Sequence, residues 1–128
     1  MSNPISWVEI PVSDMARAIE FYNSVFSWTL ASQMEGTVEI AKFPYDATFF
    51  GTSGALAYEA GTFTPSSTRG ALISFTCTDC GITSEKAEKA GGRIIQPKTP
   101  ISPLDPSLGF KAIICDSEGN RVAFVSLF

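Results

Sequence analysis

The chain has 128 residues, of which 45% are hydrophobic and 17% are charged, so it can bury one packed core of single-domain size. The net charge is −4 and the nine Lys and Arg residues are scattered, which argues against a nucleic-acid or anionic-membrane partner. No apolar stretch approaches the roughly 18 residues of a membrane-spanning helix, and the odd count of three cysteines favours reduced thiols and a cytoplasmic protein.

Residues 7–12 alternate in a strand-like way, with Val8, Ile10 and Val12 on one face and Trp7, Glu9 and Pro11 on the other. Ile10 is expected beneath the next helix, with Trp7 and Glu9 on the opposite, concave face. Asp14 then supplies a helix N-cap, and apolar residues recur at helical spacing as far as Phe26. A turn at Glu35-Gly36 indicates a hairpin. The helix is expected at 15–26 and the later strands at 28–32, 37–43 and 54–58, with a possible short strand at 48–50.

The second half of the chain repeats this order of elements. The segment 59–70 is rich in Gly, Ser, Thr and Pro and is typical of a linker. Strands are expected at 71–78, 93–96, 110–115 and 121–127, and a helix at 82–90 after the capping residue Asp79. We therefore predict one domain over residues 1–128, with a first module at 1–58, the linker at 59–70 and a second module at 71–128.

Two pairs of landmarks support an internal duplication. The capping residues Asp14 and Asp79 are 65 positions apart (79 − 14), and so are the turn glycines Gly54 and Gly119 (119 − 54). The middle strands depart from this offset, which indicates a longer loop in the second half. The predicted fold is α+β, with two βαβββ modules that form a curved mixed sheet around a concave cavity and carry their helices outside.

Short motifs in both halves resemble those of one superfamily. These are Trp-Val-Glu-Ile-Pro-Val-Ser-Asp at 7–14, Gly-Thr-Ser-Gly-Ala-Leu at 51–56, and Cys-Asp-Ser-Glu-Gly-Asn at 115–120. They resemble the vicinal oxygen chelate superfamily, which includes glyoxalase I, bleomycin resistance proteins and extradiol dioxygenases. The resemblance covers essentially the whole chain and implies this βαβββ fold and a homodimer.

The resemblance also implies four metal-ligand positions on the concave side. They fall here on Trp7, Tyr58, Leu72 and Ala123, of which three cannot bind a divalent ion and the fourth is a lone neutral phenol. The sequence contains no histidine, the commonest transition-metal ligand and general base near neutral pH. We therefore expect neither a metal ion nor another cofactor.

The same positions suggest an aromatic and apolar pocket in place of a metal site. Glu9 and Arg121 share the concave face by strand alternation, so they either form a salt bridge or orient a ligand. Ser74 could add a hydroxyl hydrogen bond. The predicted ligand-binding residues are Trp7, Glu9, Tyr58, Leu72, Ser74, Arg121 and Ala123.

Two functions are consistent with these residues. The favoured one is metal-free binding of a small molecule of unknown identity. The alternative is an enzyme, either a diverged lyase or isomerase that uses Glu9 as general base or a dioxygenase-like protein with carboxylate-only metal ligands. Cys80 lies near a helix N-terminus, where the helix dipole favours a reactive thiolate, whereas Cys77 is expected beneath the helix, where buried cysteines are usually inert.

Overall fold

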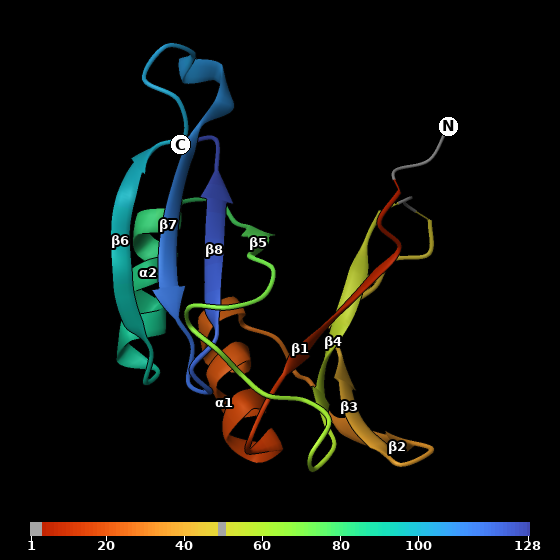
Figure 1. The fold of residues 1–128 in the computed structure, drawn as a ribbon. Helices are drawn as coiled ribbons and strands as arrows, with labels where there is room; N and C mark the ends of the chain where they lie inside the picture. The colour runs from red at the N-terminus through yellow and green to blue at the C-terminus, as the bar shows by residue number, and fades with distance from the viewer. Residues whose placement is uncertain (1–3, 49–50) are drawn as a thin grey trace.

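The computed structural model describes residues 4–48 and 51–128, which form two four-stranded mixed sheets and two α-helices (Figure 1). The first half comprises β1 (Trp7–Pro11), α1 (Met15–Phe26), β2 (Ser32–Glu35), β3 (Val38–Lys42) and β4 (Ser53–Tyr58). The second half comprises β5 (Ile73–Thr76), α2 (Cys80–Lys89), β6 (Arg93–Pro100), the short 3-10 helix η1 (Pro106–Leu108), β7 (Phe110–Cys115) and β8 (Arg121–Ser126). Each half therefore has the predicted order βαβββ.

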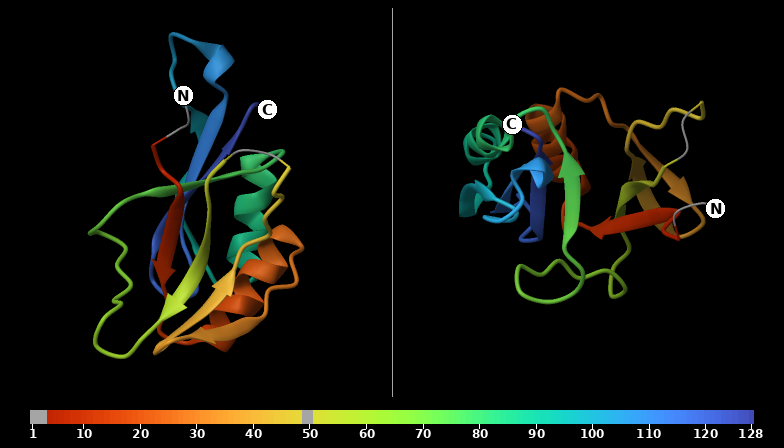
Figure 2. Two further views of the ribbon diagram at one scale, coloured as in Figure 1. Left: turned by 90° about the vertical axis from the view of Figure 1, so that its right-hand side faces the viewer. Right: turned by 90° about the horizontal axis from the view of Figure 1, so that it is seen from above.

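The strand order is β1-β4-β3-β2 in the first sheet and β5-β8-β7-β6 in the second. β1 runs parallel to β4 and β5 parallel to β8, and the other neighbours are antiparallel. Both helices lie on one side of the sheets, and the linker of residues 59–70 crosses on the other side, which we call the concave side (Figure 2). The predicted α+β fold of two modules is confirmed, and the sheets do not close into a barrel.

Capping residues fix both ends of α1. The Asp14 side chain accepts a hydrogen bond from the Arg17 N–H, and Ser27 adopts the left-handed conformation after the last turn. The buried face of α1 comprises Met15, Ala18, Phe21, Tyr22 and Val25. This spacing of three and four residues gives an amphipathic helix that packs on the core. Within the described residues, neither helix is long and apolar enough to cross a membrane.

Aromatic rings from both halves meet around Tyr22 of α1. Its ring centroid lies 5.8 Å from that of Phe75 in β5 and 6.3 Å from that of Phe43, directly after β3. Phe26, one turn further along α1, lies 5.1 Å from Phe75 and 5.6 Å from Phe124 of β8. Apolar burial and ring packing therefore join the two sheets through one continuous core.

A buried carboxylate ties the start of α1 to the second half of the chain. Glu118, in the turn between β7 and β8, has a side chain that is 0% exposed. Its Oε1 atom accepts the backbone N–H groups of Ser13 and Asp14 at 2.9 and 2.8 Å. Arg17 donates to both of its oxygens, at 2.7 and 3.0 Å. The carboxylate thus satisfies backbone donors before the first turn of α1 and also pairs with a cation of that turn.

The same turn makes a second set of contacts with the first half. The Tyr22 hydroxyl donates to Asp116 Oδ2 at 2.6 Å, and burial is the main cause that raises the pKa of Tyr22 well above its ordinary value. The Asn120 side-chain amide donates to the Pro11 carbonyl at 2.7 Å. The turn is therefore bonded to both β1 and α1.

The linker covers part of the concave side. Ile40 of β3 and Ala55 and Ala57 of β4 are buried there in a small apolar cluster, against which Phe63 of the linker packs. In the pairing of β3 with β4, Ile40 lies beside Ala57, whereas Leu56 alternates to the other face and belongs to the main core. Phe63 thus covers the concave face of the first sheet.

The far end of the linker is bound to the second sheet. The Ser66 N–H donates to Asn120 Oδ1, and the Arg121 N–H donates to the Ser66 carbonyl, each at 3.3 Å. The Ser66 hydroxyl oxygen accepts the N–H of Arg69 at 2.9 Å, which closes a turn. The linker is therefore attached at two points. Phe63 packs on the first sheet, and Ser66 is hydrogen-bonded to Arg121, the first residue of β8.

The predicted first arm of the hairpin, at 28–32, is wrong. β2 begins only at the last of these residues. Asn23 of α1 accepts the Leu30 N–H on its side-chain oxygen at 2.8 Å, and the Trp28 ring stacks on Phe26 at 4.5 Å. These residues pack back onto α1, so they are not free to pair with β3.

Other boundaries differ less from the prediction. α2 begins at Cys80, two residues early, because the Asp79 carboxylate accepts the N–H of Gly81 at 2.9 Å and so caps the helix there. β5 is shorter than expected and β6 continues to Pro100 with irregular pairing to β7. The possible strand at 48–50 lies largely outside the described residues.

We expect the variant Glu118→Gln to lower the free energy of unfolding by about 2 kcal/mol, because a buried carboxylate that accepts charged and backbone donors is replaced by an amide. Burial by itself raises the pKa of Glu118, but hydrogen bonds from Arg17, Asp14, Ser13 and Ser117 together hold it below its ordinary value. The stabilisation is therefore complete above the unfolded pKa of about 4.3 and is lost as the pH falls through the lower folded pKa.

Urea denaturation between pH 3 and pH 7 measures this effect. The wild-type protein should lose stability over the acidic part of that range, and the Glu118→Gln variant should show a shallower dependence there. Glu20→Gln, on the exposed side of α1, is the matched control and should behave as wild type. Equal acid dependence in all three proteins would contradict the prediction.

We expect Phe63→Ala to destabilise the protein by about 2 kcal/mol, less than a fully buried Phe would cost, because the ring is only partly buried. The loss should appear as a lower urea midpoint and as new binding of a hydrophobic dye above Ala55 and Ala57. Tyr45→Ala removes an aromatic ring that is 65% exposed and should change neither reading. A Phe63→Ala midpoint equal to that of wild type would show that the ring does not hold the linker.

Candidate functional site

Strand pairing identifies equivalent positions in the two halves. Glu9 and Ser74 each lie five residues before the capping aspartate of the following helix. Glu9 pairs with Ala55 and Ser74 pairs with Ala123. Ala55 is therefore the first-half equivalent of Ala123, at an offset of 68 residues (123 − 55), against 65 for the first strands (74 − 9).

The prediction that Tyr58 is the partner of Ala123 is wrong. It depended on an offset of 65 between Gly54 and Gly119, and β4 is shifted by three residues from that alignment. Tyr58 pairs with Glu39, on the face of the first sheet that also carries Leu56. Since Leu56 belongs to the main core, Tyr58 lies on the helix side and not on the concave side.

With this correction, the four metal-ligand positions implied by the resemblance are Trp7, Ala55, Leu72 and Ala123. An indole N–H is a donor only, and alkyl side chains offer no ligand atom, so these residues do not fit a metal ion. Across residues 4–48 and 51–128, His, Cys, Asp and Glu side chains do not gather in any group of three that could hold one. The carboxylate-only site of the alternative interpretation is not assembled by these residues.

The four positions have very different exposure. Ala55 is fully buried in the cluster that Phe63 covers, and Ala123 is 1% exposed. Trp7 and Leu72 are 42% and 41% exposed. These residues therefore do not form one shared apolar lining. The two positions in the middle of the sheets are buried, and the positions on β1 and just before β5 are exposed to solvent.

A pocket of about 170 Å³ lies where β1 approaches β5 and β8, next to the linker. Its apolar lining comes from Ile10, Pro11, Ile73 and Val122 with Gly70 and Ala71. Its polar lining comes from Glu9, Thr64, Ser66, Arg69, Asn120 and Arg121. Both sheets and the linker thus contribute, so the pocket exists only in the assembled fold.

Two of the predicted ligand-binding residues, Glu9 and Arg121, line this pocket together. The expected salt bridge between them does not form, because neither takes part in the ion pairs within 4.0 Å that the described residues make. The Glu9 carboxylate instead accepts a hydrogen bond from the Trp7 indole N–H at 3.3 Å. Arg121 alternates with the buried Val122 along β8, which places it on the concave side.

The remaining predicted residues do not line the pocket. Ser74 is exposed on the concave face of β5, beside Ala123. The lining residues Thr64 and Ser66 were missed because a Gly- and Ser-rich segment gives no sign of the surface that it crosses. Asn120 could have been found, since it closes the acidic turn motif of the second half.

Cys77 and Cys80 pack inside the fold. Cys80 is fully buried, and its N–H donates to the Ser126 hydroxyl at 3.0 Å. The Cys77 thiol contacts the Val125 carbonyl at 3.7 Å, and burial is the main cause that raises its pKa. The burial of Cys80 keeps its sulfur away from solvent, so the reactive interpretation of Cys80 is not supported.

Comparisons with known proteins agree with this geometry. A Glyoxylase-like domain-containing protein from Didymella fabae is 30% identical over 122 residues, which are 93% of this chain and 90% of that protein. The crystal structure of glyoxalase I from Zea mays has a TM-score of 0.70 at 21% identity over 94% of this chain. This chain spans only 45% of the maize chain, about half its length.

A glyoxalase/bleomycin resistance protein from Albidiferax ferrireducens T118 matches over nearly its whole length. It has a TM-score of 0.68 at 12% identity and covers 97% of this chain, which in turn covers 98% of that protein. At this level of sequence identity, structural similarity shows only the fold. Residues 4–124 also match the family described as Glyoxalase/Bleomycin resistance protein/Dioxygenase superfamily, so this chain belongs to that superfamily.

Proposed function

We propose that this protein binds a small organic molecule on its concave side without a resident metal ion. The observation that carries the proposal is the replacement of all four metal-ligand positions, at Trp7, Ala55, Leu72 and Ala123, beside a pocket that keeps polar groups. Pockets that bind small molecules combine apolar walls with a few oriented polar side chains. Glu9 and Arg121 supply such side chains here.

Metal analysis tests the proposal directly. Protein purified from medium supplemented with Zn²⁺ and Ni²⁺ should carry well below one ion per chain, because no set of donor atoms converges at these positions. Titration with either ion should leave the tryptophan emission unchanged. Trp7→Phe is the control that assigns the signal, since Trp7 is exposed on the concave side and Trp28 packs in the core.

Native mass spectrometry and a thermal-shift screen of small organic molecules test the binding itself. We expect a bound species or a stabilising compound whose effect is lost in a Glu9→Gln/Arg121→Gln variant. A stoichiometric, tightly held metal ion would overturn the metal-free part of the proposal. A complete lack of stabilising compounds would overturn the binding part.

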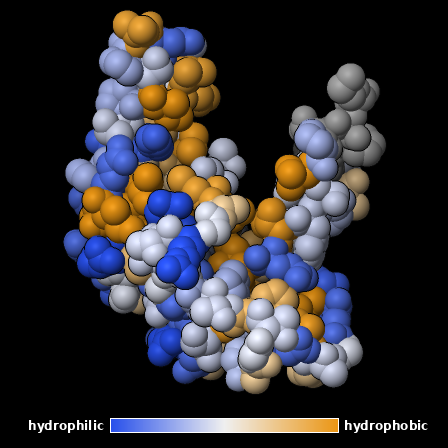
Figure 3. Space-filling model, viewed as in Figure 1, coloured by the Kyte–Doolittle hydropathy of each residue, from blue (hydrophilic) through white to orange (hydrophobic). Residues whose placement is uncertain are grey.

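We also propose that the chain forms a homodimer. β1 and β5 are the end strands of their sheets, and each has one edge without a strand partner in the described part of the chain. The molecule is hollowed between the arm of β1 to β4 and the arm of β5 to β8, with apolar surface on its walls (Figure 3). Trp7 and Leu72 are exposed beside these edges. A second copy related by two-fold symmetry would cover both edges.

Light scattering after size exclusion tests this proposal. The wild-type protein should have the mass of two chains at micromolar concentration, and Trp7→Glu/Leu72→Glu should shift it toward one chain, because charges would be buried in the interface. Leu104→Glu, at a position 92% exposed in the hairpin after β6, is the control and should remain dimeric. A wild-type mass of one chain would contradict the proposal.

We infer a cytoplasmic location and one folding unit over residues 1–128. Cys77, Cys80 and Cys115 carry free thiols, which supports a reducing compartment. The core shared by both halves supports a single cooperative unit, in which residues 59–70 connect two modules.

A further inference from the structure

The pocket between the sheets holds two opposite charges from different parts of the fold. Glu9 comes from β1 in the first sheet, and Arg121 comes from β8 in the second. Neither charge belongs to an ion pair made by residues 4–48 or 51–128. A carboxylate and a guanidinium that share a small pocket without pairing leave both groups available to a third molecule.

The rest of the lining limits the size and polarity of that molecule. The pocket of about 170 Å³ is smaller than the roughly 300–1,000 Å³ of pockets that hold drug-sized ligands. Its walls are aliphatic at Ile10, Ile73 and Val122. The Thr64 and Ser66 hydroxyls lie at the linker side and can add hydrogen bonds. A small aliphatic compound with polar ends suits this lining.

We propose that the pocket binds a small zwitterion of the α-amino acid class, with its carboxylate on Arg121 and its ammonium group on Glu9. The inference rests on the proposed function and names its ligand class. Glu9 and Arg121 carry opposite charges, so a ligand with both a carboxylate and an ammonium group can pair with each of them. A ligand with only an acid or only an amine would leave one of these two charges without a partner.

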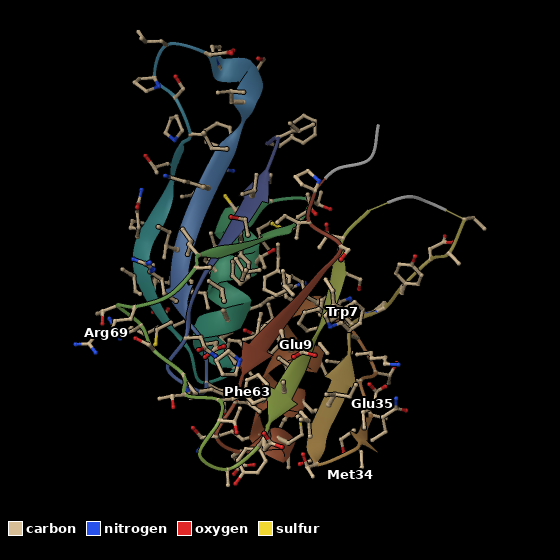
Figure 4. All side chains as sticks on the ribbon, turned by 45° about the vertical axis from the view of Figure 1, so that its right-hand side comes forward. Trp7, Glu9, Met34, Glu35, Phe63 and Arg69 are labelled. Carbon is tan, nitrogen blue, oxygen red and sulfur yellow. The ribbon has the colours of Figure 1, made fainter. Side chains whose placement is uncertain are left out.

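Arg69 is a third charged residue in the lining of the pocket. Figure 4 shows its side chain directed outward at the edge of the molecule, away from Glu9, so the ligand carboxylate is assigned to Arg121. Glu9 lies on β1 in the same view, and Phe63 lies on the linker. Arg93→Gln, at the start of β6, removes one exposed positive charge outside the pocket lining, which makes it the matched control for Arg121→Gln.

Isothermal titration with three related compounds tests the proposal. L-valine carries both charges, N-acetyl-L-valine lacks the ammonium charge, and L-valinamide lacks the carboxylate. We expect L-valine to bind at least about tenfold more tightly than either derivative, because each derivative loses one charge-assisted hydrogen bond.

Variants assign each charge to its side chain. Glu9→Gln should weaken L-valine binding about tenfold and leave N-acetyl-L-valine unchanged. Arg121→Gln should weaken L-valine binding and leave L-valinamide unchanged. Arg93→Gln, outside the pocket lining, and Glu39→Gln, on the other face of the first sheet, should bind L-valine as wild type does. Unfolding midpoints measured without ligand show whether each variant is folded.

The outcomes separate this inference from the proposed function. Equal binding of L-valine and both derivatives, or an unchanged affinity in Glu9→Gln, would overturn the zwitterion assignment. If L-valine fails to bind while another compound from the thermal-shift screen does, the zwitterion assignment falls and small-molecule binding stands. If no compound binds, both fall.

Discussion

The Glu118 carboxylate is the interaction on which the rest of the structure depends. It comes from the turn between β7 and β8, yet three of its donors are the backbone of Ser13 and Asp14 and the side chain of Arg17 in the first half. A charge removed from water is stabilising only if its hydrogen bonds are complete. Here they are complete only when both halves are folded and docked. The hydrogen bonds of Glu118 therefore hold the N-terminal end of α1 in place against the second sheet.

The concave side follows from this docking. The Asn120 side chain, two residues beyond Glu118, donates to the Pro11 carbonyl at the end of β1 and accepts the Ser66 N–H of the linker. One turn therefore sets the distance between the sheets and also holds the linker. The pocket lies at this junction, so its shape depends on the turn. Changes at the turn should consequently alter both the stability of the fold and the shape of the pocket.

Much of the fold could be predicted because its signals are local. The Asp14 cap, the helical spacing as far as Phe26 and the alternation around Glu9 each depend on neighbouring residues, and the structure places all three as predicted. The errors came from long-range effects. Asn23 binds residues after α1 that otherwise suit a strand, and the three-residue shift of β4 is visible only from its pairing with β1. No local pattern could show that Phe63 would fold back over the first sheet.

The corrected register changes the meaning of the missing metal ligands. Had Tyr58 occupied the fourth position, an aromatic ring would have stood in the cavity as part of an open lining. The position instead belongs to Ala55, whose small side chain leaves room that Phe63 fills from the linker. The centre of the first sheet is thereby closed, while Arg121 on the second sheet stays accessible. The pocket on the concave side thus lies at the junction, where the first sheet contributes Glu9 and the second contributes Arg121. These two opposite charges do not pair with each other, and the side chains at Trp7, Ala55, Leu72 and Ala123 offer no ligand atoms for a metal ion.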